Sequence, residues 1–160
     1  MTIRPTTVAD AEAIWQIFKA VVAGGDTYVF APDTPRQEAL DYFLGPSIQS
    51  WVAEEDGVVV GMYKLIPNRR DLGSHVANAS FMVAPPAHGL GIGRAMGEHC
   101  LNEARRAGYQ AMQFNFVVST NKGAVHLWQE LGFTILATQP KAFKHSRLGY
   151  VDAHVMHRFL

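Results

Sequence analysis

The sequence predicts a single α/β (α+β) domain that spans residues 1–160. Apolar strand-like runs alternate with segments of helical periodicity along the chain. A glycine-rich loop joins one such strand to the helix that follows it. A chain of 160 residues with 48% hydrophobic residues can also bury a full core in one unit. No repeat, low-complexity tract or linker divides the sequence, so one domain is expected.

The predicted elements follow in order from apolar spacing and from turn residues. Asp10 is expected to cap an amphipathic helix that carries Ile14, Ile17, Phe18 and Val21 on one face. Further helices are predicted over 35–44, 93–107 and 122–131, and Gly108 follows the second of these as a helix terminator. Strands are predicted over 2–4, 51–53, 58–65, 76–83, 111–118, 133–138 and 150–159.

The composition argues against several classes of protein. Lys plus Arg number 14 and Asp plus Glu number 14, so the basic excess of a general nucleic-acid binder is absent. No apolar run reaches membrane length, residues 1–5 lack a signal pattern, and the single Cys100 cannot form an internal disulfide. The histidines follow no metal-ligand pattern. We expect a cytoplasmic protein with no metal and no nucleic-acid or membrane partner.

The segment 88–93, His-Gly-Leu-Gly-Ile-Gly, is the most informative stretch of the chain. Glycine lets the main chain approach a ligand closely. The start of the following helix offers unpaired N–H groups and a positive dipole end to an anion. A tight turn that packs a helix on a sheet is the structural alternative, but it explains three glycines in five residues less well. The loop therefore predicts a phosphate site.

Two common glycine loops do not fit this spacing. In the Rossmann pattern G-x-G-x-x-G, the last glycine would fall on Arg94 when counted from Gly89, or on Met96 when counted from Gly91. A P-loop requires Gly-Lys-Ser/Thr, which does not occur in the chain. The phosphate site is therefore of a different kind.

The loop does fit Q/R-x-x-G-x-G/A with His88 in the first place, and it resembles the pyrophosphate loop of the GCN5-related N-acetyltransferase (GNAT) family. Residues 121–133 resemble the second signature of that family, N-x-x-A-x-x-L-Y-x-x-L-G-F. The two signatures stand in the family's order and at its separation. The resemblance implies a mixed, mostly antiparallel sheet flanked by helices, in which the central strands 76–83 and 111–118 splay apart. It also implies acetyl-CoA as the acetyl donor.

The resemblance also assigns residues to the cofactor. It implies that the backbone N–H of Val83 acts as oxyanion donor toward the thioester carbonyl. The N–H groups of the glycine loop would hold the pyrophosphate. The full set of expected cofactor contacts is Met82, Val83, His88, Gly89, Gly91, Gly93, Arg94, Asn121, Ala124 and Trp128.

The sequence departs from the family pattern at two positions. Trp128 stands where the family often has a Tyr that protonates the departing thiolate, and an indole N–H cannot serve as a general acid. A thiolate is already a tolerable leaving group, so water suffices as the proton source. Packing on an amphipathic helix and lining the CoA arm are equally good interpretations of Trp128.

The second departure is the lack of a carboxylate in 77–80, where many relatives carry a Glu as general base. Asn78 and Asn115 instead interrupt two apolar strands that should be neighbours in the sheet. Asn is depleted in strands and needs hydrogen-bond partners when buried. A solvated sheet face is the alternative and is favoured for Gln113. For the two asparagines we predict a catalytic and substrate-binding role in the cleft.

These asparagines, the segment 25–30 and the tail 141–153 resemble one GNAT subgroup, the N-acetyltransferases of L-azetidine-2-carboxylate and other proline analogues. That resemblance adds Tyr28 and Phe30 to the expected substrate contacts. His145 is expected in a basic loop between the last two strands, where it would contact a substrate carboxylate or a partner subunit or lie in solvent.

The sequence thus predicts an acetyl-CoA-dependent N-acetyltransferase that acts on a small amine, such as an amino acid or proline analogue. A homodimer is expected, as in many GNAT proteins. Acetylation of a protein or peptide amine is one alternative. A non-catalytic acyl-CoA-binding module is the other, because the Tyr and the Glu are both missing.

Overall fold

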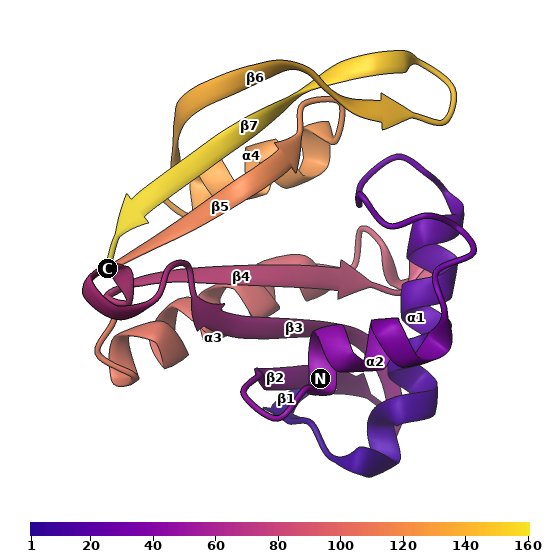
Figure 1. Cartoon of the computed structure of the whole chain (residues 1–160). Helices are drawn as coiled ribbons and strands as arrows, with labels where there is room; N and C mark the ends of the chain where they lie inside the picture. Colours follow the sequence, from indigo (N-terminus) through magenta and orange to yellow (C-terminus); the bar gives the residue numbers. More distant parts are fainter.

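Seven strands form one mixed sheet in the order β1-β2-β3-β4-β5-β7-β6, in a computed structural model that describes residues 1–160 (Figure 1). All neighbouring strands are antiparallel except β4 and β5, which are parallel. The strands are β1 (Thr2–Pro5), β2 (Gln49–Glu55), β3 (Val58–Pro67), β4 (Val76–Val83), β5 (Ala111–Val118), β6 (Thr134–His145) and β7 (Gly149–Phe159).

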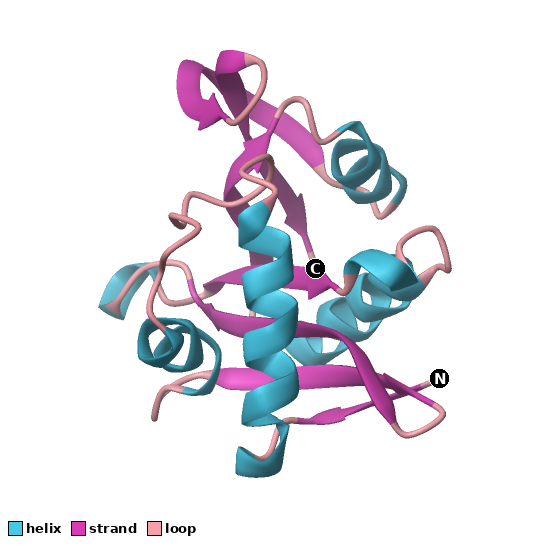
Figure 2. Ribbon diagram, turned by 90° about the vertical axis from the view of Figure 1, so that its right-hand side faces the viewer, coloured by secondary structure: helices cyan, strands magenta, loops and turns pink.

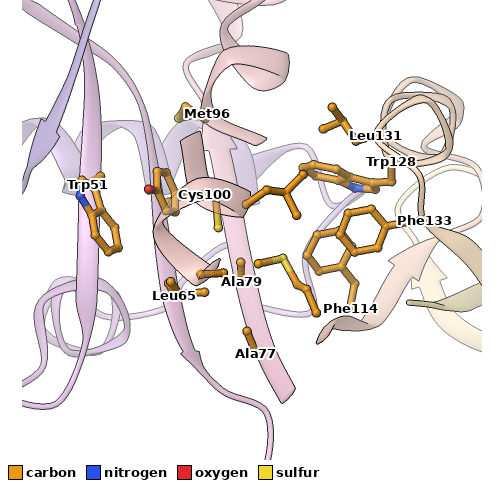
Figure 3. Close-up of a cluster of buried hydrophobic side chains, with 14 of the residues drawn as sticks. Trp51, Leu65, Ala77, Ala79, Met96, Cys100, Phe114, Trp128, Leu131 and Phe133 are labelled. Atoms are coloured by element: carbon orange, nitrogen blue, oxygen red, sulfur yellow. The ribbon is translucent and has the colours of Figure 1, made fainter. Parts of the chain in front are cut away.

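Four helices cover the two faces of the sheet (Figure 2). They are α1 (Ala11–Ala23), α2 (Arg36–Leu44), α3 (Ile92–Arg106) and α4 (Lys122–Glu130). Helices α1 and α2 bury one core cluster with Val52, Met62 and Met82. Side chains alternate between the faces of a strand, so their neighbours Trp51, Tyr63 and Phe81 meet α3 and α4 on the other face. Figure 3 shows part of this second, larger core.

Strands β4 and β5 separate along their length, as the family resemblance implies. Their pairing is confined to the first two residues of each strand, Val76 with Ala111 and Ala77 with Met112. Beyond that point the ribbons diverge (Figure 1). The predicted class, one α/β domain with splayed central strands, is confirmed. No helix has both the length and the apolar character needed to cross a membrane.

The start of α1 differs from the prediction. Asp10 is the residue before the helix, but its side chain makes no capping hydrogen bond to α1. Its carboxylate instead accepts hydrogen bonds from the backbone and hydroxyl of Thr7 and from the guanidinium of Arg4. Three of the four predicted apolar positions of α1 are buried, whereas Val21 is half-buried beside the fully buried Val22.

The last hairpin is longer than predicted. Pro140 lacks an N–H, and Lys141 adopts a φ of 52°, so the pairing of β6 with β7 shifts register between Gln139 and Phe143. Phe143 then pairs with Val151, and β6 continues to His145. The prediction that His145 lies in a loop between the last two strands is therefore wrong. The His145 side chain is buried, and its Nδ1 accepts hydrogen bonds from the next turn.

Candidate active site

A cavity of about 250 Å³ occupies the opening between β4 and β5. The wall combines the loop before α2, both splayed strands and the first turns of α4. Most of the lining is apolar or aromatic, with a few polar side chains, as in small-molecule sites. The lining residues are Thr27, Tyr28, Val29, Phe30, Tyr42, Asn78, Ala79, Ser80, Phe81, Phe114, Asn115, Phe116, Val117, Val118, Asn121, Ala124 and Trp128.

The loop at 24–30 is held over the cavity from two sides. The hydroxyl of Tyr28 donates to the backbone oxygen of Phe81 on β4 at 2.6 Å. At the other end, Ser146 in the β6–β7 turn bonds through its backbone N–H to Gly25 and through its hydroxyl to Gly24. Burial raises the pKa of Tyr28, so its phenol stays neutral. The expected contacts Tyr28 and Phe30 are thus fixed at the cavity wall.

The two predicted asparagines both line this cavity, one from each splayed strand. Asn115 is oriented by two neighbours: its Nδ2 donates to Asn68 Oδ1 at 2.7 Å, and its Oδ1 accepts from Gln113 Nε2 at 3.0 Å. No side-chain hydrogen bond ties Asn78 to the protein. Asn78 is therefore the freer of the two to bind a ligand, whereas Asn115 is held in one orientation.

The glycine loop leaves a continuous row of backbone donors. Residues Gly89 to Arg94 donate no N–H to any carbonyl or side chain of the protein, because α3 begins at Ile92 and its intrahelical bonds start later. Gly89 and Gly91 have φ values of 79° and 80°, which favour glycine, and open space surrounds the position of a Cβ at both. Six free donors at a helix N-terminus suit a pyrophosphate.

Val83 lies between this loop and the cavity. The N–H of the next residue, Ala84, donates to the Val60 oxygen on β3. Successive residues of an antiparallel strand direct their backbone groups to opposite sides, so the N–H and C=O of Val83 point away from β3. They face the side on which β5 has diverged. His88 Nε2 donates to the Val83 oxygen at 3.0 Å and links the glycine loop to the end of β4. The N–H of Val83 remains directed into the opening.

The second sequence signature forms the opposite wall. Asn121 caps α4 by accepting a hydrogen bond from Ala124 N at 3.2 Å, and both residues line the cavity. Trp128 lines the cavity one turn further along. Its ring packs on Phe81 and Phe114, with ring centroids 4.8 and 4.7 Å apart, and Figure 3 shows it beside Phe114. Both interpretations of Trp128, packing and lining, describe its position.

Some expected contacts lie elsewhere. The Met82 side chain is buried in the core beneath α1, and the residue pairs with Met62 on β3, so the structure does not place it at the opening. The Arg94 side chain forms an ion pair with Glu130, which leaves its backbone N–H as its contribution to the loop. His145 is buried in its hairpin and does not line the cavity.

Three polar residues at or behind the wall were not predicted from the sequence. Tyr42 on α2 lines the cavity and shares a hydrogen bond of 2.7 Å with Ser80 on β4. Asn68, just after β3, holds Asn115. No motif in the sequence marks them, because each contributes through contacts with residues about 40 positions away. No Asp or Glu lines the cavity, in agreement with the missing carboxylate on β4.

Comparison with known proteins identifies the family. The profile described as the acetyltransferase (GNAT) family matches residues 14–133. The chain belongs to the GNAT family. A GCN5-related N-acetyltransferase from Kribbella flavida is 44% identical and superposes with a TM-score of 0.94 over 99% of this chain and 97% of that chain.

Two further relatives bear on cofactor and substrate. The structure of yncA, a putative acetyltransferase from Salmonella typhimurium with its cofactor acetyl-CoA, has a TM-score of 0.87 at 28% identity and covers 100% of this chain and 94% of that chain. The L-amino acid N-acyltransferase MnaT of Escherichia coli is 29% identical over 88% of this chain and 84% of its own. This GNAT protein is therefore an N-acetyltransferase.

Proposed function

We propose that this GNAT enzyme acetylates the amine of a free amino acid or a proline analogue such as azetidine-2-carboxylate. The observation that carries the proposal is the cavity at the splayed strands. It is small, it is covered by the loop at 24–30, and it presents two asparagines beside the row of free N–H groups. A covered cavity of about 250 Å³ favours a small acceptor over a protein or peptide amine.

The residues present fit acetyl-CoA. The N–H groups of Gly89 to Arg94 would hold its pyrophosphate, and Trp128, Ala124 and Asn121 would line the path of its arm. The group supplies an acetyl thioester that is open to attack by a neutral amine. The Val83 N–H would stabilise negative charge on the carbonyl oxygen, because a donor fixed in advance needs no reorganisation. As the new C–N bond forms, the C–S bond would break and CoA would leave as its thiolate.

Proton transfer involves water in this proposal. An amine must lose its proton before it attacks, and no carboxylate lines the cavity to accept it. The asparagines hold the acceptor in line by hydrogen bonds, and positioning of this kind supplies a large part of the rate. The rate should therefore rise with pH until the bound amine is deprotonated.

A thiol-release assay across a panel of amines tests the proposal. The panel contains L-azetidine-2-carboxylate, L-proline, other free L-amino acids, simple amines and short peptides with free N-termini. Free amino acids or proline analogues should give the highest kcat/KM with acetyl-CoA. Turnover confined to peptides would replace the proposal with the peptide alternative.

Alanine variants at the two asparagines test their role. Removing a hydrogen bond to a charged group costs about 1.5–3 kcal/mol, so Asn78→Ala and Asn115→Ala should each lower turnover by about 10- to 150-fold. Acetyl-CoA affinity, measured by calorimetry, should stay nearly unchanged. Wild-type turnover in both variants would show that the asparagines are structural.

We also propose that the enzyme forms a homodimer through the last hairpin. Strand β6 is at the edge of the sheet, and the hairpin exposes the apolar side chains of Leu136, Leu148 and Tyr150. An unpaired edge with exposed apolar residues favours association. Sedimentation should give the mass of two chains, and Leu136→Glu should shift it toward one.

A further inference from the structure

Lys64 is a buried cation without an anionic partner. It lies near the middle of β3, its residue is only 5% exposed, and no carboxylate lies within ion-pair distance of its Nζ. A buried charge normally has a partner, because its transfer from water is costly. The sequence gives no signal for this residue, which stands in an apolar strand.

The position of Lys64 connects it to the cavity wall. Its Nζ lies 3.1 Å from the centroid of the Tyr42 ring, a cation–π contact. Lys64 also pairs directly with Ser80 on β4, so the two side chains share one face of the sheet. Tyr42 and Ser80 both line the cavity and share a hydrogen bond. The ammonium group therefore lies immediately behind the polar part of the wall.

The charge on Lys64 persists at neutral pH. Burial lowers its pKa to about 8, and no charged neighbour contributes to that shift. Because this value lies above 7, most of the molecules carry the ammonium form. The cavity lining contains no Asp or Glu that would cancel the positive potential. A ligand is the remaining source of a counter-charge.

We propose that Lys64 is a specificity-determining residue whose buried ammonium draws the carboxylate of the acceptor toward the Tyr42–Ser80 side of the cavity. This inference rests on the proposed function, because it requires an acceptor that has both an amine and a carboxylate. It explains why a residue that is costly to bury stands in β3. It also predicts that the enzyme selects carboxylates over neutral amides of the same shape.

Matched acceptors test this selection. We would measure kcat and KM for two pairs, L-azetidine-2-carboxylate with its carboxamide and L-methionine with L-methioninamide. The wild-type enzyme should favour the carboxylate in each pair by about tenfold or more, as expected for a charge a few ångströms behind the wall. Lys64→Met should remove the preference through KM, and Lys64→Arg should keep part of it.

The melting temperature gives an independent readout. Replacing an unpaired buried charge with an apolar side chain of similar length should raise the Tm of Lys64→Met by a few degrees. In the wild type, L-azetidine-2-carboxylate with CoA present should raise Tm, and this increment should shrink in Lys64→Met. A Tm that falls, with the carboxylate preference intact, would show that Lys64 only supports the core through Tyr42.

The outcomes separate the two proposals. Amino-acid acetylation with the same preference in wild type and Lys64→Met would overturn the role of Lys64 and leave the proposed function standing. A wild-type enzyme that acetylates neither member of either pair, and no other amino acid of the panel, would remove the proposed function and this inference together.

Discussion

Trp128 could act either as a proton donor or as an apolar packing surface, and its structure distinguishes these two roles. Its ring packs on Phe81, Phe114 and Phe133 and also lines the cavity, and an indole cannot deliver a proton to a thiolate. Most of its contacts come from the ring as an apolar surface. The enzyme thus has no side-chain acid at this position of α4.

Trp128→Phe should therefore turn over acetyl-CoA within a few-fold of the wild-type rate. Loss of a true general acid typically slows turnover by about 10²–10⁴-fold. Steady-state kinetics at saturating acetyl-CoA measures the difference, and Trp128→Ala serves as a control that opens the wall and raises KM. If Trp128→Phe instead slowed turnover by that range while the KM for acetyl-CoA stayed unchanged, the indole would have a chemical role.

We expect Asn68 to act as a positioning residue for Asn115 rather than as a catalytic residue. Its Oδ1 accepts from Asn115 Nδ2 at 2.7 Å and fixes the orientation of that amide from outside the cavity lining. Asn68→Ala should raise the KM for the amine acceptor. Asn68→Asp keeps the oxygen that accepts the hydrogen bond, so its KM should return most of the way to the wild-type value. Equal kinetics in Asn68→Ala and wild type would mean that Gln113 alone orients Asn115.

At the scale of elements, the turn from β4 into α3 is the surface that we propose for the cofactor. The free N–H groups exist because a helix cannot satisfy its own first donors, and Gly89 and Gly91 bring them to an open surface. In this proposal the backbone conformation of the loop, through its free N–H groups, binds the pyrophosphate.

Gly91→Glu should abolish acetyl-CoA binding, because a side chain and a negative charge would occupy the pyrophosphate site. The matched control is Gly57→Glu in the β2–β3 turn, where the φ is also 80° and no atom lies within 4 Å of a Cβ. Both variants bear the same backbone strain, about 1–2 kcal/mol. Calorimetry should detect binding in the control alone, and equal affinity in the two folded variants would contradict the cofactor assignment.

At the scale of the whole molecule, a small charged network joins β1, β2 and the start of α1. Arg4 bonds to both oxygens of the Asp10 carboxylate at 2.8 and 2.9 Å and to Glu54 on β2 at 2.8 Å. The hydrogen bond from Arg4 is the main reason that the pKa of Asp10 falls to about 2. Asp10 is buried, so solvent screens this interaction weakly.

The network predicts a defined loss of stability in acid. A carboxyl group whose pKa is lowered on folding stabilises the protein above its unfolded pKa of 3.8, and this contribution disappears as pH falls toward 2. Asp10→Asn should cost about 2 kcal/mol near pH 6 and almost nothing near pH 2. Urea unfolding at several pH values measures the difference. Asp33→Asn, at an exposed carboxylate without an ion pair, is the control, and a pH-independent cost in Asp10→Asn would contradict the prediction.

Local signals explain why most elements could be predicted from the sequence. The apolar alternation of 76–83 and 111–118 and the turn residues at Asp56 and Gly57 act over a few positions, so β4, β5 and the β2–β3 hairpin follow from them directly. The prediction failed at Pro140, where a bulge lets β6 continue, because pairing with β7 compensates for the break.

The sequence by itself determined the class of the fold, the glycine loop and the family, since each depends on residues that are close together in the chain. The tertiary structure decided which side chains share the cavity. Asn68 lies 47 positions from Asn115, Tyr42 lies 38 positions from Ser80, and Lys64 meets Tyr42 across two elements. Such contacts depend on strand order and on the face toward which each residue points, and packing of the whole sheet sets both.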